Sequence, residues 1–125
     1  MPQSRAPEQL LPLTPAVFHI LLSLADAERH GYGIMKQVEA DTDGRVQMGP
    51  GTLYGTIKRL LAAGLIAETD ERPDPEMDDE RRRYYRLTDW GRRVLTAEAE
   101  RLEALIRLAR QKDVVRALRL GEGGV

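Results

Sequence analysis

The chain has 125 residues, of which 42% are hydrophobic and 31% charged, and a formal net charge of −1; this balance is typical of one globular domain. With no cysteine and two histidines, the composition excludes thiol chemistry and disulfides, and we expect neither an enzyme, a metal nor a cofactor. The longest apolar run, residues 16–24, is too short to span a membrane, and no secretory signal opens the sequence, so we expect a cytoplasmic protein.

The first predicted helix has a clear beginning. Thr14 is suited to cap it and Pro15 to begin it, because the first helical N–H has no partner inside the helix. We expect this helix to end near Ala27. Its apolar residues exceed one buried face, since Phe18 and Leu22 form a second stripe. We interpret this stripe as a contact with a second subunit, and a fully buried central helix is the alternative.

Two further helices are predicted before residue 65. The second helix covers about 31–41, and alternating apolar and polar residues at 45–48 predict a very short strand after it. Pro50 begins the third helix, because proline suits the first helical position. Gly64 is placed to end this helix in the left-handed conformation that is common at helix C-termini.

The pattern then changes to strands. Residues 65–72 and 81–87 are short and rich in Ile, Thr, Tyr and Leu, which favours two strands. Between them, residues 73–80 hold two prolines and five acidic residues, so we expect a hairpin loop. Thr88 is suited to cap a long last helix.

The last helix carries a coiled-coil pattern. Its apolar residues recur four and three residues apart on an otherwise charged helix, which predicts a seam with the same helix of a second copy. The residues of this seam are Leu95, Ala99, Leu102 and Ile106.

The order helix, helix, short strand, helix, strand, loop, strand, helix is that of a winged helix-turn-helix. We therefore expect a mainly α fold with a small β-hairpin wing, followed by a C-terminal dimerisation helix. The expected parts are an N-terminal arm at 1–13, the winged helix-turn-helix domain at 14–87, the dimerisation helix at 88–120 and a frayed tail at 121–125.

In this fold the third helix enters the major groove of DNA, and its exposed face suits that task. Gly51 and Gly55 lie opposite the predicted core side. Glycine costs roughly 1 kcal/mol relative to alanine in a helix, so close approach of a partner to the backbone explains the pair better than a solvated surface does. A chance of composition is the alternative. The predicted core side consists of Leu53, Ile57, Leu60 and Leu61.

Polar and basic side chains surround these glycines. Lys58 and Arg59 can reach phosphates and base edges, although solubilising surface charge is the alternative. Arg82 lies at the stem of the predicted wing, where it contacts phosphate or, alternatively, joins an internal arginine–carboxylate cluster. The residues that this reasoning assigns to DNA are Gly51, Thr52, Tyr54, Gly55, Lys58, Arg59 and Arg82.

Several short stretches form one ordered combination along the chain. They are residues 13–15 (LTP), 30–34 (HGYGI), 49–55 (GPGTLYG), 58–60 (KRL), 64–66 (GLI) and 84–91 (YYRLTDWG). In this combination, which spans about residues 10–110, the chain resembles the PadR family of transcriptional regulators, in the subgroup with a short C-terminal region. It departs from the usual family pattern at Gly49, where a serine would cap the third helix.

The resemblance implies a homodimeric repressor, often of genes for phenolic-acid or multidrug defence, that is released from its operator by a small molecule or another signal. It also implies dimerisation through the C-terminal helix, packed with the first helix of the partner subunit. Carried over position by position, it implies DNA contacts at Tyr32, Thr52, Tyr54 and Lys58.

Trp90 is the only tryptophan of the chain. It packs beneath the wing or, alternatively, lines a space for a small apolar or aromatic effector, as the resemblance suggests.

The leading hypothesis is a sequence-specific repressor that binds a pseudo-palindromic operator in double-stranded DNA. The alternative is a winged-helix protein-interaction module without DNA binding. The acidic loop slightly favours the alternative, whereas the glycine-lysine face of the third helix favours DNA.

Overall fold

Residues 6–69 and 83–115 are described by the computed structural model, and they form helices and one three-stranded sheet. This confirms the predicted fold class, a mainly α protein with a small β wing. The predicted loop at 73–80, Arg82 and the tail at 121–125 lie outside the described residues. The elements are the 3₁₀ helix η2 (Pro7–Leu10), α1 (Pro15–Ser23), β1 (Arg29–His30), α2 (Gly31–Asp41), α3 (Pro50–Ala62), β2 (Ile66–Thr69), β3 (Tyr84–Leu87) and α4 (Asp89–Gln111).

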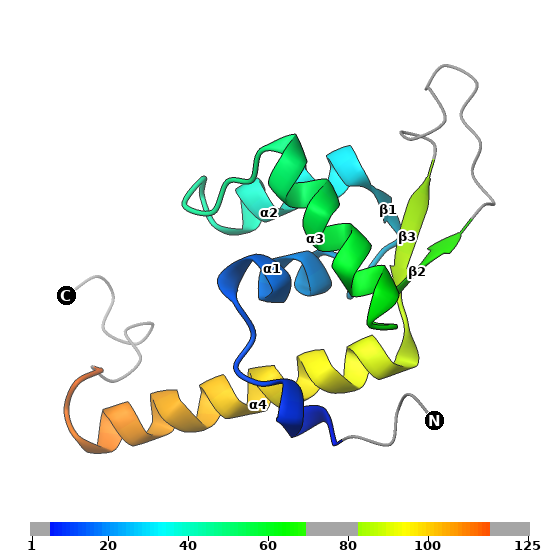
Figure 1. The fold of residues 1–125 in the computed structure, drawn as a ribbon. Helices are drawn as coiled ribbons and strands as arrows, with labels where there is room; N and C mark the ends of the chain where they lie inside the picture. The colour runs from blue at the N-terminus through cyan, green and yellow to red at the C-terminus, as the bar shows by residue number, and fades with distance from the viewer. Residues whose placement is uncertain (1–5, 70–82, 116–125) are drawn as a thin grey trace.

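The helices α1, α2 and α3 and the sheet lie on one side of the first half of α4, while the second half of α4 extends beyond them (Figure 1). The core lies where α1, α2, α3 and the start of α4 meet, and removing each of its large apolar side chains from water contributes roughly 1.5–3 kcal/mol. None of the described helices combines the length and apolarity needed to cross a bilayer. The most deeply buried apolar residues are Ile20, Leu21, Ile34, Val38, Leu53, Ile57, Ile66 and Val94.

The helices begin where the sequence predicts. The hydroxyl of Thr14 accepts a hydrogen bond from the Val17 N–H at 3.2 Å, and the hydroxyl of Thr88 accepts one from the Gly91 N–H at 2.9 Å. Pro50 is the first residue of α3. Local sequence signals therefore determine where α1, α3 and α4 start.

The end of α3 also follows its prediction. Gly64 has φ +76°, the left-handed conformation. The Leu65 N–H donates to the Leu60 carbonyl at 3.0 Å and the Gly64 N–H donates to the Leu61 carbonyl at 3.1 Å, which is the Schellman arrangement. This cap turns the chain directly from α3 into β2.

The first strand differs from its prediction. The structure places β1 at Arg29–His30, before α2, and not at 45–48. The sheet order is β1-β3-β2, with all pairs antiparallel. Apolar and polar residues alternate at 45–48 because Val46 and Met48 pack against the core from a loop. The Val46 N–H donates to the hydroxyl of Thr42 at 3.0 Å and not to a neighbouring strand.

The prediction that α1 continues to Ala27 is also wrong, because α1 ends at Ser23. The Ser23 hydroxyl donates back to the Ile20 carbonyl at 2.7 Å. The Ser23 carbonyl in turn accepts a hydrogen bond from Nε of Arg29 at 2.7 Å. A tertiary contact from β1 therefore takes the place of the next helical turn.

The start of α4 is locked to the end of α3. The Thr88 hydroxyl donates to the Gly64 carbonyl at 2.7 Å, and the Thr88 N–H donates to the Leu65 carbonyl at 3.2 Å. A Cβ atom on Gly91 would collide with that same Leu65 carbonyl oxygen, so only glycine permits this approach. The two helices are thereby joined by the hydrogen bonds of Thr88 and by the close approach of Gly91 to the Leu65 carbonyl.

Candidate nucleic-acid interface

The third helix has two different faces. Leu53, Ile57 and Leu60 are 1%, 2% and 4% exposed, and they point into the core together with the buried Thr56. Leu61, also assigned to the core side, is only half-buried against it. On the outward side, Gly55 is half-buried and the other residues assigned to DNA are exposed, namely Gly51, Thr52, Tyr54, Lys58 and Arg59.

Packing among the described residues does not require the glycines of this outward face. Apart from its chain neighbours and the adjacent backbone of α3, a Cβ atom built on Gly51 or Gly55 meets no described atom within 4 Å. The situation is different at Gly31 of α2, where a Cβ atom would collide with the ring of Tyr54. The backbone of α3 is therefore accessible over the stretch that the two outward glycines mark.

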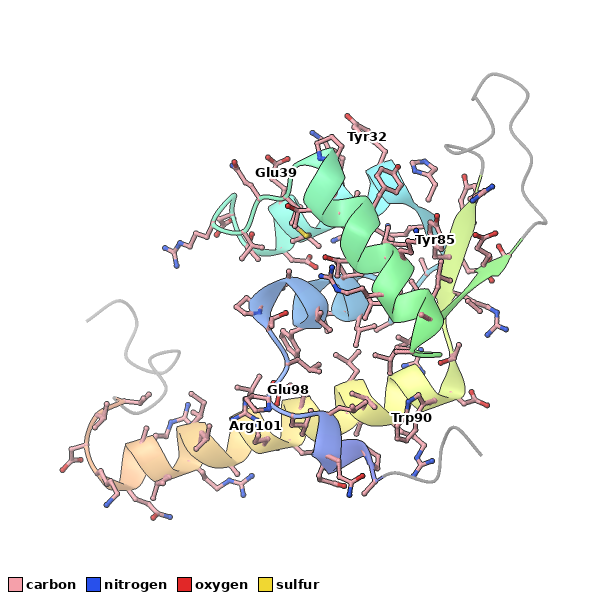
Figure 2. All side chains as sticks on the ribbon, viewed as in Figure 1. Tyr32, Glu39, Tyr85, Trp90, Glu98 and Arg101 are labelled. Atoms are coloured by element: carbon pink, nitrogen blue, oxygen red, sulfur yellow. The ribbon has the colours of Figure 1, made fainter. Side chains whose placement is uncertain are left out.

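Tyr54 joins α3 to the start of α2, because its ring occupies the space above Gly31. Tyr32 follows in the first turn of α2 and is 52% exposed, and Nζ of Lys36 lies 5.8 Å from its ring centroid in a cation–π contact. Figure 2 shows Tyr32 beside the beginning of α3. Tyr32, which was assigned from the resemblance alone, thus lies on the same surface as the outward face of α3.

A groove of about 430 Å³ separates α3 from the wing. Arg83 of the wing stem pairs with Glu68 of β2, with Nη1 and Oε2 3.7 Å apart. Arg59 lies on the other side of α3, and its Nη2 donates to the Thr56 hydroxyl at 3.2 Å. The residues that line the groove are Tyr54, Ile57, Lys58, Leu61, Glu68, Arg83 and Tyr85.

The predicted DNA contact of the wing stem can be located only in part within the described residues. Arg82 lies outside the described residues, whereas Arg83 beside it is described and its side chain is 54% exposed. Lys58 lines the same groove from the α3 side. A described basic side chain therefore stands on each wall of the groove.

The second half of α4 presents an uncovered apolar stripe. Leu102 and Ile106 of the predicted seam are 36% and 44% exposed, and Ala99 is exposed as well. Leu105 and Leu108, which the seam pattern omitted, are 48% and 45% exposed and widen the stripe. An exposed apolar helix face of this kind is typical of an interaction surface.

One residue of the predicted seam belongs elsewhere. Leu95 is 6% exposed and packs in the core of the chain, so its assignment to a subunit contact is corrected. The reason is that α4 passes over α1 in its first half, and the same heptad pattern serves an internal contact there. On α1, Leu22 is 38% exposed, and Phe18 is half-buried with its ring edge-on to His19 at 5.3 Å between centroids.

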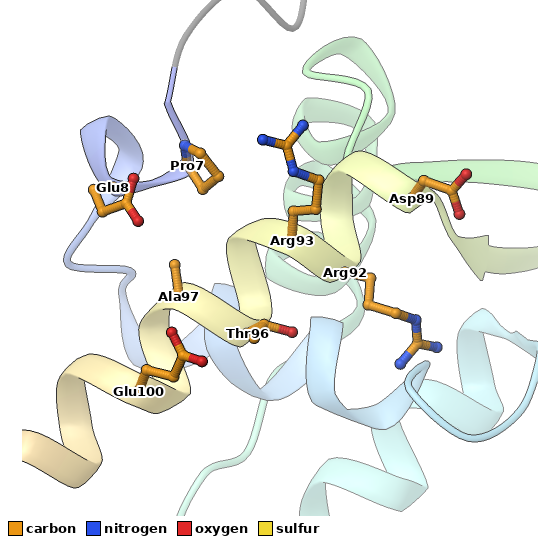
Figure 3. A pocket seen from close by; sticks show the side chains of 8 residues that line it. All are labelled: Pro7, Glu8, Asp89, Arg92, Arg93, Thr96, Ala97 and Glu100. Atoms are coloured by element: carbon orange, nitrogen blue, oxygen red, sulfur yellow. The ribbon is translucent and has the colours of Figure 1, made fainter.

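Trp90 is buried in the core with 5% of its surface exposed, and the Arg93 guanidinium lies 5.3 Å from its ring centroid. Of the two interpretations of Trp90, packing is therefore the one that the structure supports. A hollow of about 450 Å³ lies nearby along α4, but charged side chains surround it (Figure 3). Histidines and carboxylates do not gather into a metal-binding group of three anywhere in residues 6–69 or 83–115. The hollow is lined by Pro7, Glu8, Asp89, Arg92, Arg93, Thr96, Ala97 and Glu100.

Sequence reasoning missed the role of Glu98, which is only 2% exposed. Its Oε2 accepts hydrogen bonds from the Leu13 N–H at 2.9 Å and from Nη2 of Arg101 at 3.1 Å (Figure 2). The hydrogen bond from Arg101 lowers the pKa of the Glu98 carboxyl, against the opposing effect of burial. Glu98 thereby ties α4 to the segment that leads into α1.

Comparison with known proteins places this architecture in a family. The family model for the transcriptional regulator PadR-like family matches residues 20–97. The transcriptional regulator Rv3488 of Mycobacterium tuberculosis is 38% identical over 89 residues, which are 71% of this chain and 77% of that protein.

Two solved structures have the same fold. A transcriptional regulator from Clostridium thermocellum is 26% identical with a TM-score of 0.61, over 77% of this chain and 87% of the other. A PadR family transcription regulator from Clostridium difficile is 22% identical with a TM-score of 0.63, over 78% of this chain and 97% of the other. Members of this family are transcriptional regulators. The chain belongs to the PadR-like family of transcriptional regulators.

Proposed function

We propose that this regulator is a homodimeric repressor that binds a pseudo-palindromic operator through α3 and leaves it when a small molecule or another signal alters the dimer. The observation that carries the proposal is the outward face of α3. It combines accessible backbone at Gly51 and Gly55 with the exposed cation of Lys58.

The DNA contacts follow from that face. With no side chain at Gly51 and Gly55, the helix backbone can lie deep in the major groove, where base edges carry sequence information. Lys58 and Arg59 contact phosphates beside the groove, and these contacts set position and most of the salt dependence. The proposed DNA-binding residues are Tyr32, Gly51, Thr52, Tyr54, Gly55, Lys58, Arg59 and Arg82.

The stripe on α4 supports the homodimer. Leu102 and Ile106, with Ala99, face the same residues of a second copy, and Phe18 and Leu22 of α1 cover the flank of the partner's α4. A twofold dimer presents its two recognition helices about 34 Å apart, one turn of DNA, which is why the operator is pseudo-palindromic. A signal that changes this spacing prevents both helices from entering the groove together.

The effector is a small apolar or aromatic molecule held between the subunits. The burial of Trp90 and the charged lining of the hollow along α4 argue against a site within one chain. The uncovered leucines of α4 offer the apolar side chains from which such a site is built.

The test is selection of bound sequences from a random DNA library, followed by fluorescence anisotropy of the best sequence across a salt series. Lys58→Ala should weaken binding to all sequences and lower the slope of log affinity against log salt by roughly one, because one phosphate contact is lost. Lys112→Ala, which removes an exposed cation at the far end of α4, is the matched control and should leave the slope unchanged.

An unchanged slope for Lys58→Ala would contradict the phosphate contact. Weak, sequence-independent binding by the wild-type dimer would contradict the operator and favour the protein-interaction module.

A further inference from the structure

His30 occupies a junction between three elements. It ends β1, where it pairs with Tyr84 of β3, and it is the N-cap residue of α2. Its Nδ1 accepts a hydrogen bond from the Gly33 N–H at 2.9 Å. The ring thus takes the capping role that Ser, Thr, Asp or Asn usually fills.

This cap determines which ring nitrogen carries the proton. A neutral imidazole has one acceptor nitrogen and one donor nitrogen. Since Nδ1 accepts from Gly33, Nε2 is the donor. Within residues 6–69 and 83–115, the hydrogen bond that involves the His30 ring is the one at Nδ1, and the residue is only half-buried, so Nε2 can donate to a partner outside the chain.

Neighbouring rings hold the imidazole in place. The Tyr84 ring meets it edge-on at 5.2 Å between centroids, and the Tyr32 ring lies nearly parallel to it at 6.4 Å. On the helix side, a Cβ atom on Gly33 would come within 3.4 Å of the His30 Cε1 atom, so the ring lies against the first turn of α2. A donor fixed in this way contributes more to binding than a freely rotating one.

The surroundings of His30 indicate the kind of partner. The next residue, Gly31, is covered by Tyr54 of the recognition helix, and Tyr84 belongs to the wing. Lys36 adds a cation beside Tyr32, although Glu39 pairs with it at 3.5 Å. The donor therefore stands between the two elements that flank a bound DNA backbone in a winged helix, where phosphate oxygens are the acceptors.

We infer that His30 is a DNA-backbone contact, donating its Nε2–H to a phosphate next to the groove that α3 enters. This inference rests on the proposed function, because it presumes that α3 binds DNA. The one side chain then has two tasks: Nδ1 caps α2, and Nε2 positions the protein on the duplex.

Two substitutions separate these tasks. His30→Asn and His30→Ser keep an oxygen that can accept from the Gly33 N–H, but their shorter side chains lack the distant donor. Both should unfold within a few degrees of the wild type and bind the selected operator about tenfold more weakly. Binding to a scrambled sequence should weaken by the same factor, because a phosphate contact carries no sequence information. His30→Ala should lose affinity as well and, without the cap, unfold at a lower temperature.

Thr14→Asn is the matched control, since it exchanges the cap of α1, whose neighbour Leu13 is bonded to α4 rather than to the DNA face. It should bind DNA like the wild type. Wild-type affinity in both His30→Asn and His30→Ser would show that capping is the only role of His30 and overturn the inference. An equal loss in Thr14→Asn would attribute the effect to capping in general and overturn it too. Failure of the wild type itself to bind any DNA would instead overturn the proposed function, and this inference with it.

Discussion

The helices α3 and α4 each bury one face and leave another uncovered, but the uncovered faces have opposite chemistry. The face of α3 carries glycines with open space around them and the cations Lys58 and Arg59. The face of α4 carries leucines and an isoleucine that are 36% to 48% exposed. The contrast matches the two partners that we propose, a polyanion for α3 and a second copy of an apolar helix for α4, and it teaches that one chain can prepare each uncovered face for a different partner.

Leu102→Asp is the substitution that we expect to disrupt the proposed dimer contact of α4 most strongly. In a twofold dimer the change places two carboxylates against apolar side chains, which we expect to cost about 4 kcal/mol or more of dimer stability. Size-exclusion chromatography with light scattering should show a folded monomer, and operator binding should fall with the loss of the second recognition helix. Ala104→Asp, an exposed position off the stripe of the same helix, should remain dimeric. A dimeric mass for Leu102→Asp would rule out the α4 interface.

The joint between the two helices is tested by Gly91→Ala. The added methyl group would collide with the backbone oxygen of Leu65, and a backbone atom cannot rotate away as a side chain can. We expect a loss of about 3 kcal/mol in the free energy of unfolding, measured by urea denaturation. Wild-type stability would mean that α4 does not approach α3 as closely as the structure places it.

The boundary between the buried and the exposed half of α4 is tested by Glu98→Gln. The amide keeps an acceptor for the Leu13 N–H but loses the charge that binds Arg101, so we expect a loss of about 2 kcal/mol at neutral pH. Glu103→Gln is the control, because the exposed pair of Glu103 with Arg107 contributes little.

The same carboxyl predicts a pH dependence. Its pKa is lowered in the folded protein, chiefly by the Arg101 hydrogen bond, so the folded state favours the ionised form. The stabilisation is therefore complete above the ordinary carboxyl pKa and is lost as the pH falls through the lower, folded value. Thermal unfolding of the wild type and of Glu98→Gln should converge in acid. Parallel curves down to the lowest pH would contradict the ion pair.

Sequence reasoning succeeded where the determinants are local. Capping by Thr14 and Thr88 and the left-handed Gly64 depend on residues within one turn, and the sequence predicts all three. Sequence reasoning failed where a residue far away in the sequence determines the local structure. β1 has two residues and no hydrophobic alternation, so only its pairing with β3 makes it a strand.

The candidate site divides in the same way. The outward face of α3 follows from helical periodicity, because its buried side is strongly apolar. The buried role of Glu98 does not, since its partner Leu13 is 85 residues away in the sequence. Leu95 and Leu102 share one heptad pattern, and only the position of α1 over the first half of α4 distinguishes an internal contact from an intersubunit one.

Gly55→Ala tests the outward face of α3. Its expected effect on stability is the smallest of these substitutions, and it is a gain in stability where the others cause a loss. Because a Cβ atom at this position meets no described atom within 4 Å apart from its chain neighbours and the adjacent backbone of α3, alanine should stabilise the free protein by up to about 1 kcal/mol through its helix propensity. The same methyl group would occupy the space through which the helix backbone approaches the DNA, so operator affinity should fall about tenfold. Thermal unfolding and anisotropy on one preparation measure both quantities. A protein that gains stability and keeps its affinity would show that α3 does not need its glycines for DNA, and would move the recognition surface towards Tyr32 and the wing.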